Sequence, residues 1–342
     1  MWFGTRNGLN RFDGTSFKIF RNEANNPQSI GSNSILSLYE DNEEHLWVGT
    51  YKGIYIYDPI HEKFETFKKI SQLEIRYICG DKKNNIWIVA GEKLYQYNTS
   101  SKTFHVFTLH QSPLLTLNIS DEGLVWVAAA DGSIRNYNIE NNTSVDYDII
   151  KLYKSKRPVF IQTMYQVNDS ILLIATLQQA LLFNTKSLSF TNVFKGKPEE
   201  NNVQVHKIMR QSATTFWLGT ENGLYIADLA TKKIVLIKKQ YANPYSIDDN
   251  VITDFCKDKE GNTWIGTFFG GINYYSKELN QFQKYFPLPL TNSLSGNLVH
   301  EICKDKNGNL WIGTEDAGLN KLDTKTGIFT HFKPGKQKGS IS

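Results

Sequence analysis

Cysteine, methionine and long apolar runs are scarce in this sequence, and each shortage excludes a class of protein. The 342 residues include three Cys and three Met, and so few cysteines cannot form a disulfide framework. The longest apolar stretches, such as ILLIA at 171–175, are strand-sized and well short of the roughly 18 residues of a membrane-spanning helix. The N-terminus shows no signal-peptide pattern. We therefore expect a globular chain that does not itself span a membrane.

Motifs of catalysis and of metal or cofactor binding are also missing. The sequence has no GxSxG, HExxH or Walker motif, no pair of CxxC motifs, and no GxGxxG before a helix. The turns at 258–262 and 305–309 resemble the start of a calcium-binding loop but lack its terminal Glu. We therefore predict no cofactor and no metal. A pair of carboxylates that would make the chain a glycosidase or a polysaccharide lyase stays open.

Charge and aromatic content point to a sheet protein without a nucleic-acid partner. The net charge is +4, and the Lys and Arg residues are spread along the chain, so no basic patch predicts binding to nucleic acid. Aromatic residues make up 13% of the chain. Rings suit the half-buried surface of a pleated sheet, so the composition favours strands.

An internal repeat is the main signal in the sequence. The segment LWVGT at 46–50 recurs as IWIVA, VWVAA, FWLGT, TWIGT and LWIGT, and the chain itself opens with WFGT at 2–5. An eighth copy, LLIAT, has Leu173 in the tryptophan position. Successive copies lie 39 to 47 residues apart. All seven tryptophans occupy this one position: Trp2, Trp47, Trp87, Trp126, Trp217, Trp264 and Trp311.

Each full copy contains four short segments with strand character. In the last copy these are residues 298–305, 310–314, 319–323 and 328–332, and turns rich in Gly, Asn and Asp separate them. Four antiparallel strands repeated at this spacing are typical of a β-propeller blade. We predict an all-β fold, a β-propeller of four-stranded antiparallel blades, over residues 1–342.

The number of blades is left between seven and eight. Seven complete copies start near residues 34, 74, 114, 159, 204, 251 and 298, and a three-strand fragment covers residues 1–20. The fragment lacks a first strand, and GSIS at 339–342 matches the linker that precedes one. We therefore expect the chain to be a segment of a longer array.

The repeat also assigns structural roles to two residue types. The tryptophan is expected to pack between neighbouring blades. The glycine after it, together with Gly8 and Gly223, is expected where the backbone has a positive φ or approaches another chain segment closely. Cys79, Cys256 and Cys303 share one position in the first strand, and we expect small buried side chains there.

The repeat LWIGTxxGLNxxDxxTxxFxxF resembles that of the two-component regulator propeller family. The linkers NPQSIGSN at 26–33, NPYSIDDN at 243–250 and TNSLSGN at 291–297, each before a first strand, add to the resemblance. The family forms periplasmic sensor regions of hybrid two-component systems, mainly in Bacteroidetes. Its propellers are usually seven-bladed, are often paired, and precede a β-sandwich, a membrane span and a kinase. By this resemblance we expect seven blades, with eight as the alternative.

The resemblance implies a function in sensing. Family members detect glycans or their breakdown products and switch on polysaccharide-utilisation genes. By this resemblance the chain is a periplasmic, non-enzymatic sensor region of a membrane-anchored protein, with an oligosaccharide as ligand. Its neighbours would be a second propeller or a β-sandwich of the same protein, or a homodimer mate. A protein-interaction scaffold remains an alternative, because fold alone does not establish function.

Loops on a rigid scaffold carry function, so the candidate binding residues lie in turns between the second and third strands. Phe268 and Phe269 replace polar residues there, and we expect exposed rings that can stack on sugars. The other turn candidates are Arg6, Tyr51, Lys52, Glu221 and Asn222. A variable position in the first strand adds Arg76, His206 and His300, near the channel mouth. Packing against another domain, or a water-filled channel, would explain the same residues without a ligand.

Overall fold

The protein is an assembly of antiparallel β-sheets in a computed structural model that describes residues 1–109, 112–120, 123–141, 143–153, 159–197, 202–276, 278, 284–288, 291–335 and 340. Within these residues thirty strands form eight sheets, here called blades A to H in chain order. This confirms the all-β propeller prediction.

The first four blades cover the N-terminal part of the chain, and their strands follow sequence order from the inside of the blade to the outside. Blade A is β1(Trp2–Thr5) β2(Gly8–Phe12) β3(Phe17–Phe20), and blade B is β4(Ile35–Glu40) β5(Leu46–Thr50) β6(Gly53–Asp58) β7(Lys63–Ser71). Blade C is β8(Ile75–Gly80) β9(Asn85–Ala90) β10(Lys93–Asn98) β11(Phe104–Thr108), and blade D is β12(Leu114–Ile119) β13(Leu124–Ala129) β14(Ser133–Asn138) β15(Thr143–Asp148).

The remaining blades repeat this order after the short helix α1 (Ile149–Leu152). Blade E is β16(Ile161–Asn168) β17(Ile171–Thr176) β18(Ala180–Asn184) β19(Ser189–Asn192), and blade F is β20(Val205–Arg210) β21(Thr215–Thr220) β22(Gly223–Asp228) β23(Lys233–Ile237). Blade G is β24(Ile252–Lys257) β25(Thr263–Thr267) β26(Ile272–Tyr275), and blade H is β27(Val299–Lys304) β28(Leu310–Thr314) β29(Gly318–Asp323) β30(Ile328–Phe332).

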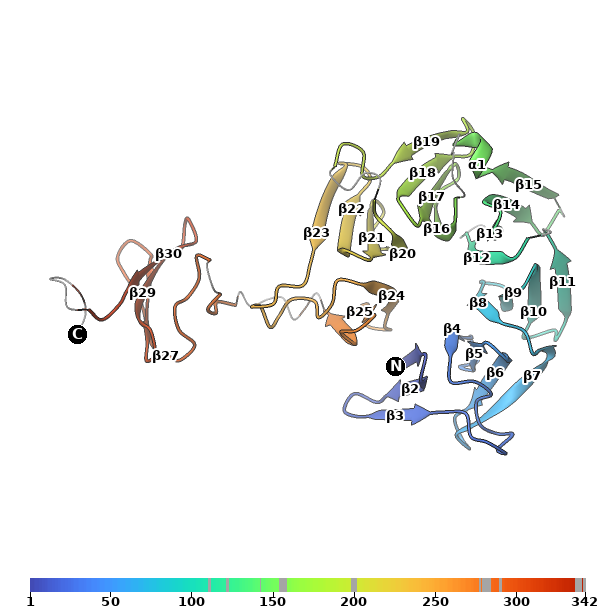
Figure 1. Cartoon of the computed structure of the whole chain (residues 1–342), viewed down its shortest axis with the longest axis horizontal. Coiled ribbons are helices and arrows are strands. Elements are labelled where there is room, and N and C mark those ends of the chain that lie inside the picture. Colours follow the sequence, from blue (N-terminus) through green and yellow to red (C-terminus); the bar gives the residue numbers. More distant parts are fainter. Residues whose placement is uncertain are drawn as a thin grey trace.

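Seven blades make the ring. Blades A to G follow one another around a centre toward which the first strands face, whereas blade H stands apart (Figure 1). The ring closes between blades G and A, where the rings of Phe3 and Phe12 lie 5.8 and 6.1 Å from that of Trp264. Seven is the smaller of the two blade counts that the repeat allows. Blade G has three strands among the described residues, and residues 277 and 279–283, which follow β26 (Ile272–Tyr275), lie outside them.

The repeated Trp and Gly build the joints between blades, as the repeat predicts. Trp47 of blade B is buried with Ile75 and Ile78 of blade C. A Cβ on Gly49 would lie 2.8 Å from Cγ2 of Ile75, so only glycine leaves room for the next first strand there. The prediction of positive φ is confirmed at Gly8, with a φ of 119°, and at Gly223, with a φ of 124°.

The aspartates of the calcium-like turns anchor the tryptophans. Oδ2 of Asp258 accepts the indole N–H of Trp264 at 3.0 Å, and Oδ1 accepts the backbone N–H of Asn262 at 2.8 Å. In blade H, hydrogen bonds from Asn309 and Trp311 lower the pKa of Asp305 to about 2. Both carboxylates therefore accept hydrogen bonds from the hairpin and the indole of their own blade.

The prediction that all three cysteines are buried is wrong. Cys79 is half-buried and packs on blade D, but Cys256 and Cys303 are exposed. This position faces the following blade. Blade A, which follows Cys256 around the ring, has no first strand among the described residues, and blade H has no neighbouring blade in Figure 1. The position is therefore covered only where a complete blade comes next.

Blade H shows what the missing neighbour does to a first strand. All six residues of β27 are exposed, including Val299 at 43% and Ile302 at 56%. The corresponding residues of blade C, Ile75 and Ile78, are 0% and 3% exposed. Apart from its neighbours, blade H keeps its four strands but buries only a small core of Leu294, Ile312, Leu322 and Phe329.

Candidate functional site

In several blades a threonine hydroxyl caps the turn between the second and third strands. Thr50 donates its Oγ1–H to the carbonyl of Gly53 at 2.9 Å and accepts the backbone N–H of Lys52 at 3.0 Å. Thr5 and Thr220 make the same pair of bonds in blades A and F. The cap closes a tight turn whose two central residues project outward. In these blades they are Arg6 with Asn7, Tyr51 with Lys52, and Glu221 with Asn222.

The turn of blade G is wider and carries two exposed rings. Thr267 caps the carbonyl of Gly271, four residues on. Phe268 is 51% exposed and Phe269 is 85% exposed, as the sequence predicts. The linker before β24 braces the turn, because Oδ2 of Asp249 accepts the backbone N–H of Phe269 at 2.8 Å. The rings are therefore held outward by a fixed backbone.

Ring closure brings Arg6 next to these two phenylalanines. The two rings stand edge to face with centroids 4.6 Å apart, and the guanidinium carbon of Arg6 lies 5.9 Å from the centre of the Phe268 ring. We call Arg6, Phe268 and Phe269 the aromatic cluster. An exposed ring face beside a guanidinium can stack on a sugar and donate hydrogen bonds to hydroxyl or acidic groups.

The variable first-strand position coincides with a β-bulge in every first strand described. The register shifts between Ile75 and Tyr77 in blade C and between Val205 and Lys207 in blade F, and likewise in blades B, D, E, G and H. A bulge sets two residues of one strand against one of its partner and re-aims their side chains. The position is thus singled out by backbone geometry.

The structure brings some of these predicted residues together and separates others. Nε2 of His206 lies 2.9 Å from Oε1 of Glu221, so bulge and turn of blade F meet. Arg76 pairs instead with Glu74, at 3.4 Å. His300 pairs with Glu315 at 3.4 Å, but this pair belongs to blade H, away from the ring (Figure 1). The ring therefore groups Arg6 with Phe268 and Phe269, and His206 with Glu221.

An ion pair in the middle of the ring was missed from the sequence. Nζ of Lys207 in β20 lies 2.9 Å from Oδ1 of Asp254 in β24, and 5.6 Å from the centre of the Tyr77 ring in β8. The Asp254 carboxylate holds the pKa of Lys207 above its usual range. The three residues follow the bulge positions by one in each strand. That common offset is the signal by which they could have been found.

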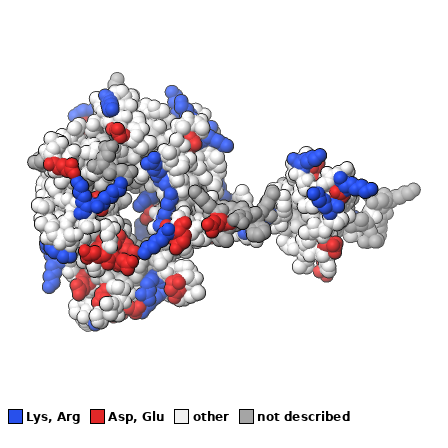
Figure 2. Space-filling model, turned by 180° about the vertical axis from the view of Figure 1, so that it is seen from behind, with Lys and Arg blue, Asp and Glu red and all other residues white. Residues whose placement is uncertain are grey.

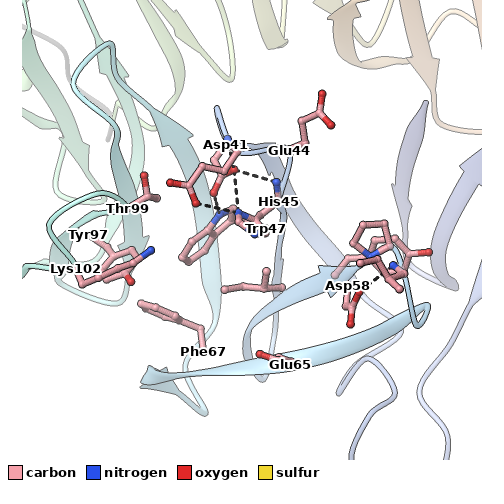
Figure 3. Close-up of a pocket in the computed structure, with 15 residues that line it drawn as sticks. Asp41, Glu44, His45, Trp47, Asp58, Glu65, Phe67, Tyr97, Thr99 and Lys102 are labelled. Carbon is pink, nitrogen blue, oxygen red and sulfur yellow. Dashed lines mark hydrogen bonds and ion pairs between the residues drawn. The ribbon is translucent and has the colours of Figure 1, made fainter.

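A groove on the other face of the ring, away from the turns between second and third strands, was also not predicted from the sequence. It encloses about 540 Å³ between blades B and C, beside the turns before β5 and β7, and contains none of the predicted residues. Trp47, Phe67 and Tyr97 form its walls, and Asp41 binds the indole of Trp47 at its upper end (Figure 3). Oδ1 of Asp41 also accepts the backbone N–H of His45 at 2.9 Å. This carboxylate is therefore engaged within the protein.

Among the described residues, neither the distribution of charge nor the arrangement of possible metal ligands indicates another candidate site. Basic and acidic side chains are intermixed over the face of the ring seen in Figure 2. No group of three His, Cys, Asp or Glu residues that could hold a metal ion occurs within the described ranges. In the same residues, no helix is both long and apolar enough to cross a membrane.

The comparisons with solved structures agree on the fold. The chain is 22% identical to the extracellular domain of the hybrid two component system BT3049 from B. thetaiotaomicron, with a TM-score of 0.73 over 96% of this chain and 45% of that one. It is 18% identical to the extracellular domain of BT4673 from the same organism, with a TM-score of 0.64 over 97% of this chain and 50% of that one. The chain thus spans about half the length of these structures.

A further solved structure is similar at the level of fold. Virginiamycin B lyase from Staphylococcus aureus shares 13% identity, with a TM-score of 0.53 over 84% of this chain and 94% of that one. No curated protein matches the chain by sequence.

The match to a protein family falls on three of the blades. Residues 29–52, 246–269 and 293–316 each match the family described as two component regulator propeller. Each match runs from the linker serine through the first two strands to the turn before the third strand, in blades B, G and H. Three repeats of this chain, in blades B, G and H, therefore match the two component regulator propeller family.

Proposed function

We propose that the chain is the ligand-binding propeller region of an extracytoplasmic sensor, and that its ligand is an oligosaccharide. The observation that carries the proposal is the aromatic cluster. Phe268 and Phe269 expose 51% and 85% of their surface on a braced turn, and Arg6 joins them from the neighbouring blade. Exposed rings offer flat apolar faces to sugar rings, and a braced backbone loses little conformational entropy on binding.

The matches to the repeat family and to the structural relatives support a proposed setting for this region. In the proposed arrangement the chain lies in the periplasm as part of a membrane-anchored regulator, beside a second propeller or a β-sandwich of the same protein or a homodimer mate. Ligand binding controls polysaccharide-utilisation genes through parts of the protein beyond this chain. The propeller itself performs no catalysis.

A glycan array followed by calorimetry tests the proposal. We expect at least one oligosaccharide to bind the wild-type chain, and binding to weaken by about tenfold or more when Phe268 and Phe269 are both replaced by Ala, since stacked aromatic contacts are worth about 1–2 kcal/mol. Tyr241→Ala is the matched control, because its ring is 91% exposed on the linker between blades F and G. This control should bind as the wild type does.

Other outcomes would favour the alternatives. Release of shortened products from the bound glycan would identify a glycosidase or a lyase. Failure of every glycan to bind, together with tight binding of a partner ectodomain that depends on the same two rings, would identify an interaction scaffold.

A further inference from the structure

The bulges single out one residue in each first strand of the ring, the residue that follows the bulge position. In blade F this residue, Lys207, reaches the Tyr77 ring of blade C, and in blade B the Ser37 hydroxyl accepts the backbone N–H of Ile78 in blade C. We call the set of these residues the inner layer. From blade B to blade G these residues are Ser37, Tyr77, Thr116, Thr163, Lys207 and Asp254. The layer thus consists of four hydroxyl-bearing side chains, one cation and one anion.

The Lys207 ammonium is incompletely satisfied by its surroundings. An ammonium has three donors. Within the part of the chain that the structure describes, Asp254 is the acidic side chain at ion-pair distance from it, and the Tyr77 ring offers only its face. The Lys207 side chain keeps 29% of its surface exposed. Solvent or a ligand can therefore approach its remaining donors.

Asp254 is held loosely enough to be replaced. Its side chain is 63% exposed, so water can solvate the Asp254 carboxylate once it leaves Lys207. Oδ1 of Asp254 also accepts the backbone N–H of Phe255 at 2.8 Å, so Lys207 is not the only donor to this oxygen within the described residues. A charge-assisted bond from Lys207 to a ligand oxygen would replace the one that is lost.

We propose that Lys207 binds an acidic group of a small ligand, a carboxylate or a sulfate, in exchange for Asp254. The site lies among the first strands, whereas the aromatic cluster lies in the turns. Its test uses single small anions and needs no oligosaccharide, so it stands or falls separately from the proposed function.

Calorimetry with glucuronate, inorganic sulfate and glucose is the experiment. Glucuronate should bind and glucose, its neutral counterpart, should not. Asp254→Asn should tighten glucuronate binding by about fivefold, because the internal competitor for Lys207 loses its charge. Lys207→Gln should weaken binding by about tenfold or more, because a charge-assisted bond is lost. Lys207→Arg keeps the cation and should retain binding.

Comparing the two anions also distinguishes a sugar acid from a free inorganic anion as the ligand. Tighter binding of glucuronate than of sulfate assigns the site to a sugar acid, and the reverse order assigns it to a free inorganic anion. Thermal unfolding of each variant shows that it is folded. Any one of three results overturns the proposal. The first is that neither anion binds the wild type or the Asp254→Asn variant. The others are that Lys207→Gln binds as the wild type does, and that Asp254→Asn is folded but binds more weakly.

Discussion

The indole nitrogen of Trp87 donates a hydrogen bond of 2.8 Å to Oδ2 of Asp81, six residues earlier in the chain. The same pair recurs as Trp47 with Asp41, Trp264 with Asp258 and Trp311 with Asp305. A buried indole needs an acceptor for its N–H. The hairpin turn supplies one, and in doing so it fixes the orientation of the ring that packs against the next blade.

Replacing Asp81 by Ala should therefore destabilise the propeller. The carboxylate also accepts the backbone N–H groups of Lys83 and Asn85 and the side-chain amide N–H of Asn85, so the change leaves four donors without this acceptor. We expect the free energy of unfolding to fall by about 1–3 kcal/mol, measured by urea denaturation. Gln211→Ala is the control, since Gln211 has the same position in blade F but bonds to Thr263 instead of to the tryptophan. Equal losses in both variants would contradict the role of the indole bond.

The contribution of each tryptophan to the free energy of unfolding should depend on the joint between blades that it fills. Trp87 is 0% exposed between two complete blades, whereas Trp264 is partly exposed at the joint with the incomplete blade A. Trp87→Ala should cost about 3–5 kcal/mol of unfolding free energy, as other buried large-to-small changes do. Trp264→Ala should cost less. Denaturation of the two variants side by side measures the difference, and a larger loss at Trp264 would show that the joint between blades G and A is tighter than described.

The glycine after the tryptophan should tolerate a methyl group only where no blade follows. At Gly49 the new Cβ would lie 2.8 Å from Ile75, but at Gly313 in blade H the nearest atom would be 3.9 Å away. Overpacking a joint costs about 1–3 kcal/mol, so we expect Gly49→Ala to lower the melting temperature. Gly313→Ala should leave it nearly unchanged. The two melting curves decide the point, and an equal fall in both would contradict it.

The three cysteines should react with iodoacetamide at different rates. The thiolate is the reactive form, and burial raises the pKa of Cys79 to about 12, so little thiolate forms near pH 8. Cys303 is exposed on blade H. We expect Cys303 to be labelled first and Cys79 last in the native protein, as followed by peptide mass spectrometry. In denaturant the three should react alike, and native labelling of Cys79 before Cys303 would contradict the packing of blades C and D.

The repeat allowed most of the fold to be predicted, because the elements that define a blade are local in sequence. The turn Asp, the Trp, the Gly and the capping Thr of LWVGT all act within one hairpin or between adjacent strands. First strands therefore begin where the repeat indicates, such as Ile35, Ile75 and Ile252. The exposure of Phe268 and Phe269 was predictable for the same reason, since they interrupt a pattern that is polar in the other blades.

The candidate site was only partly predictable, because its pairings cross between blades. Arg6 meets Phe268 only through closure of the ring, over a separation of 262 residues in sequence. Lys207 meets Asp254 and Tyr77 only because bulges in three strands turn these side chains toward one centre. The separation of His300 from the ring has a similar origin, since its blade lies outside the ring of seven.

By itself, then, the sequence determined the blade, its strand order, and the roles of its Trp and Gly, since these depend on hydrogen bonds and packing among near neighbours in the chain. The tertiary structure decided how many blades close the ring, which cysteines are covered, and which charged side chains meet in the middle. Those outcomes depend on the curvature and closure of the whole ring, and on the side chains that each face meets in the next blade.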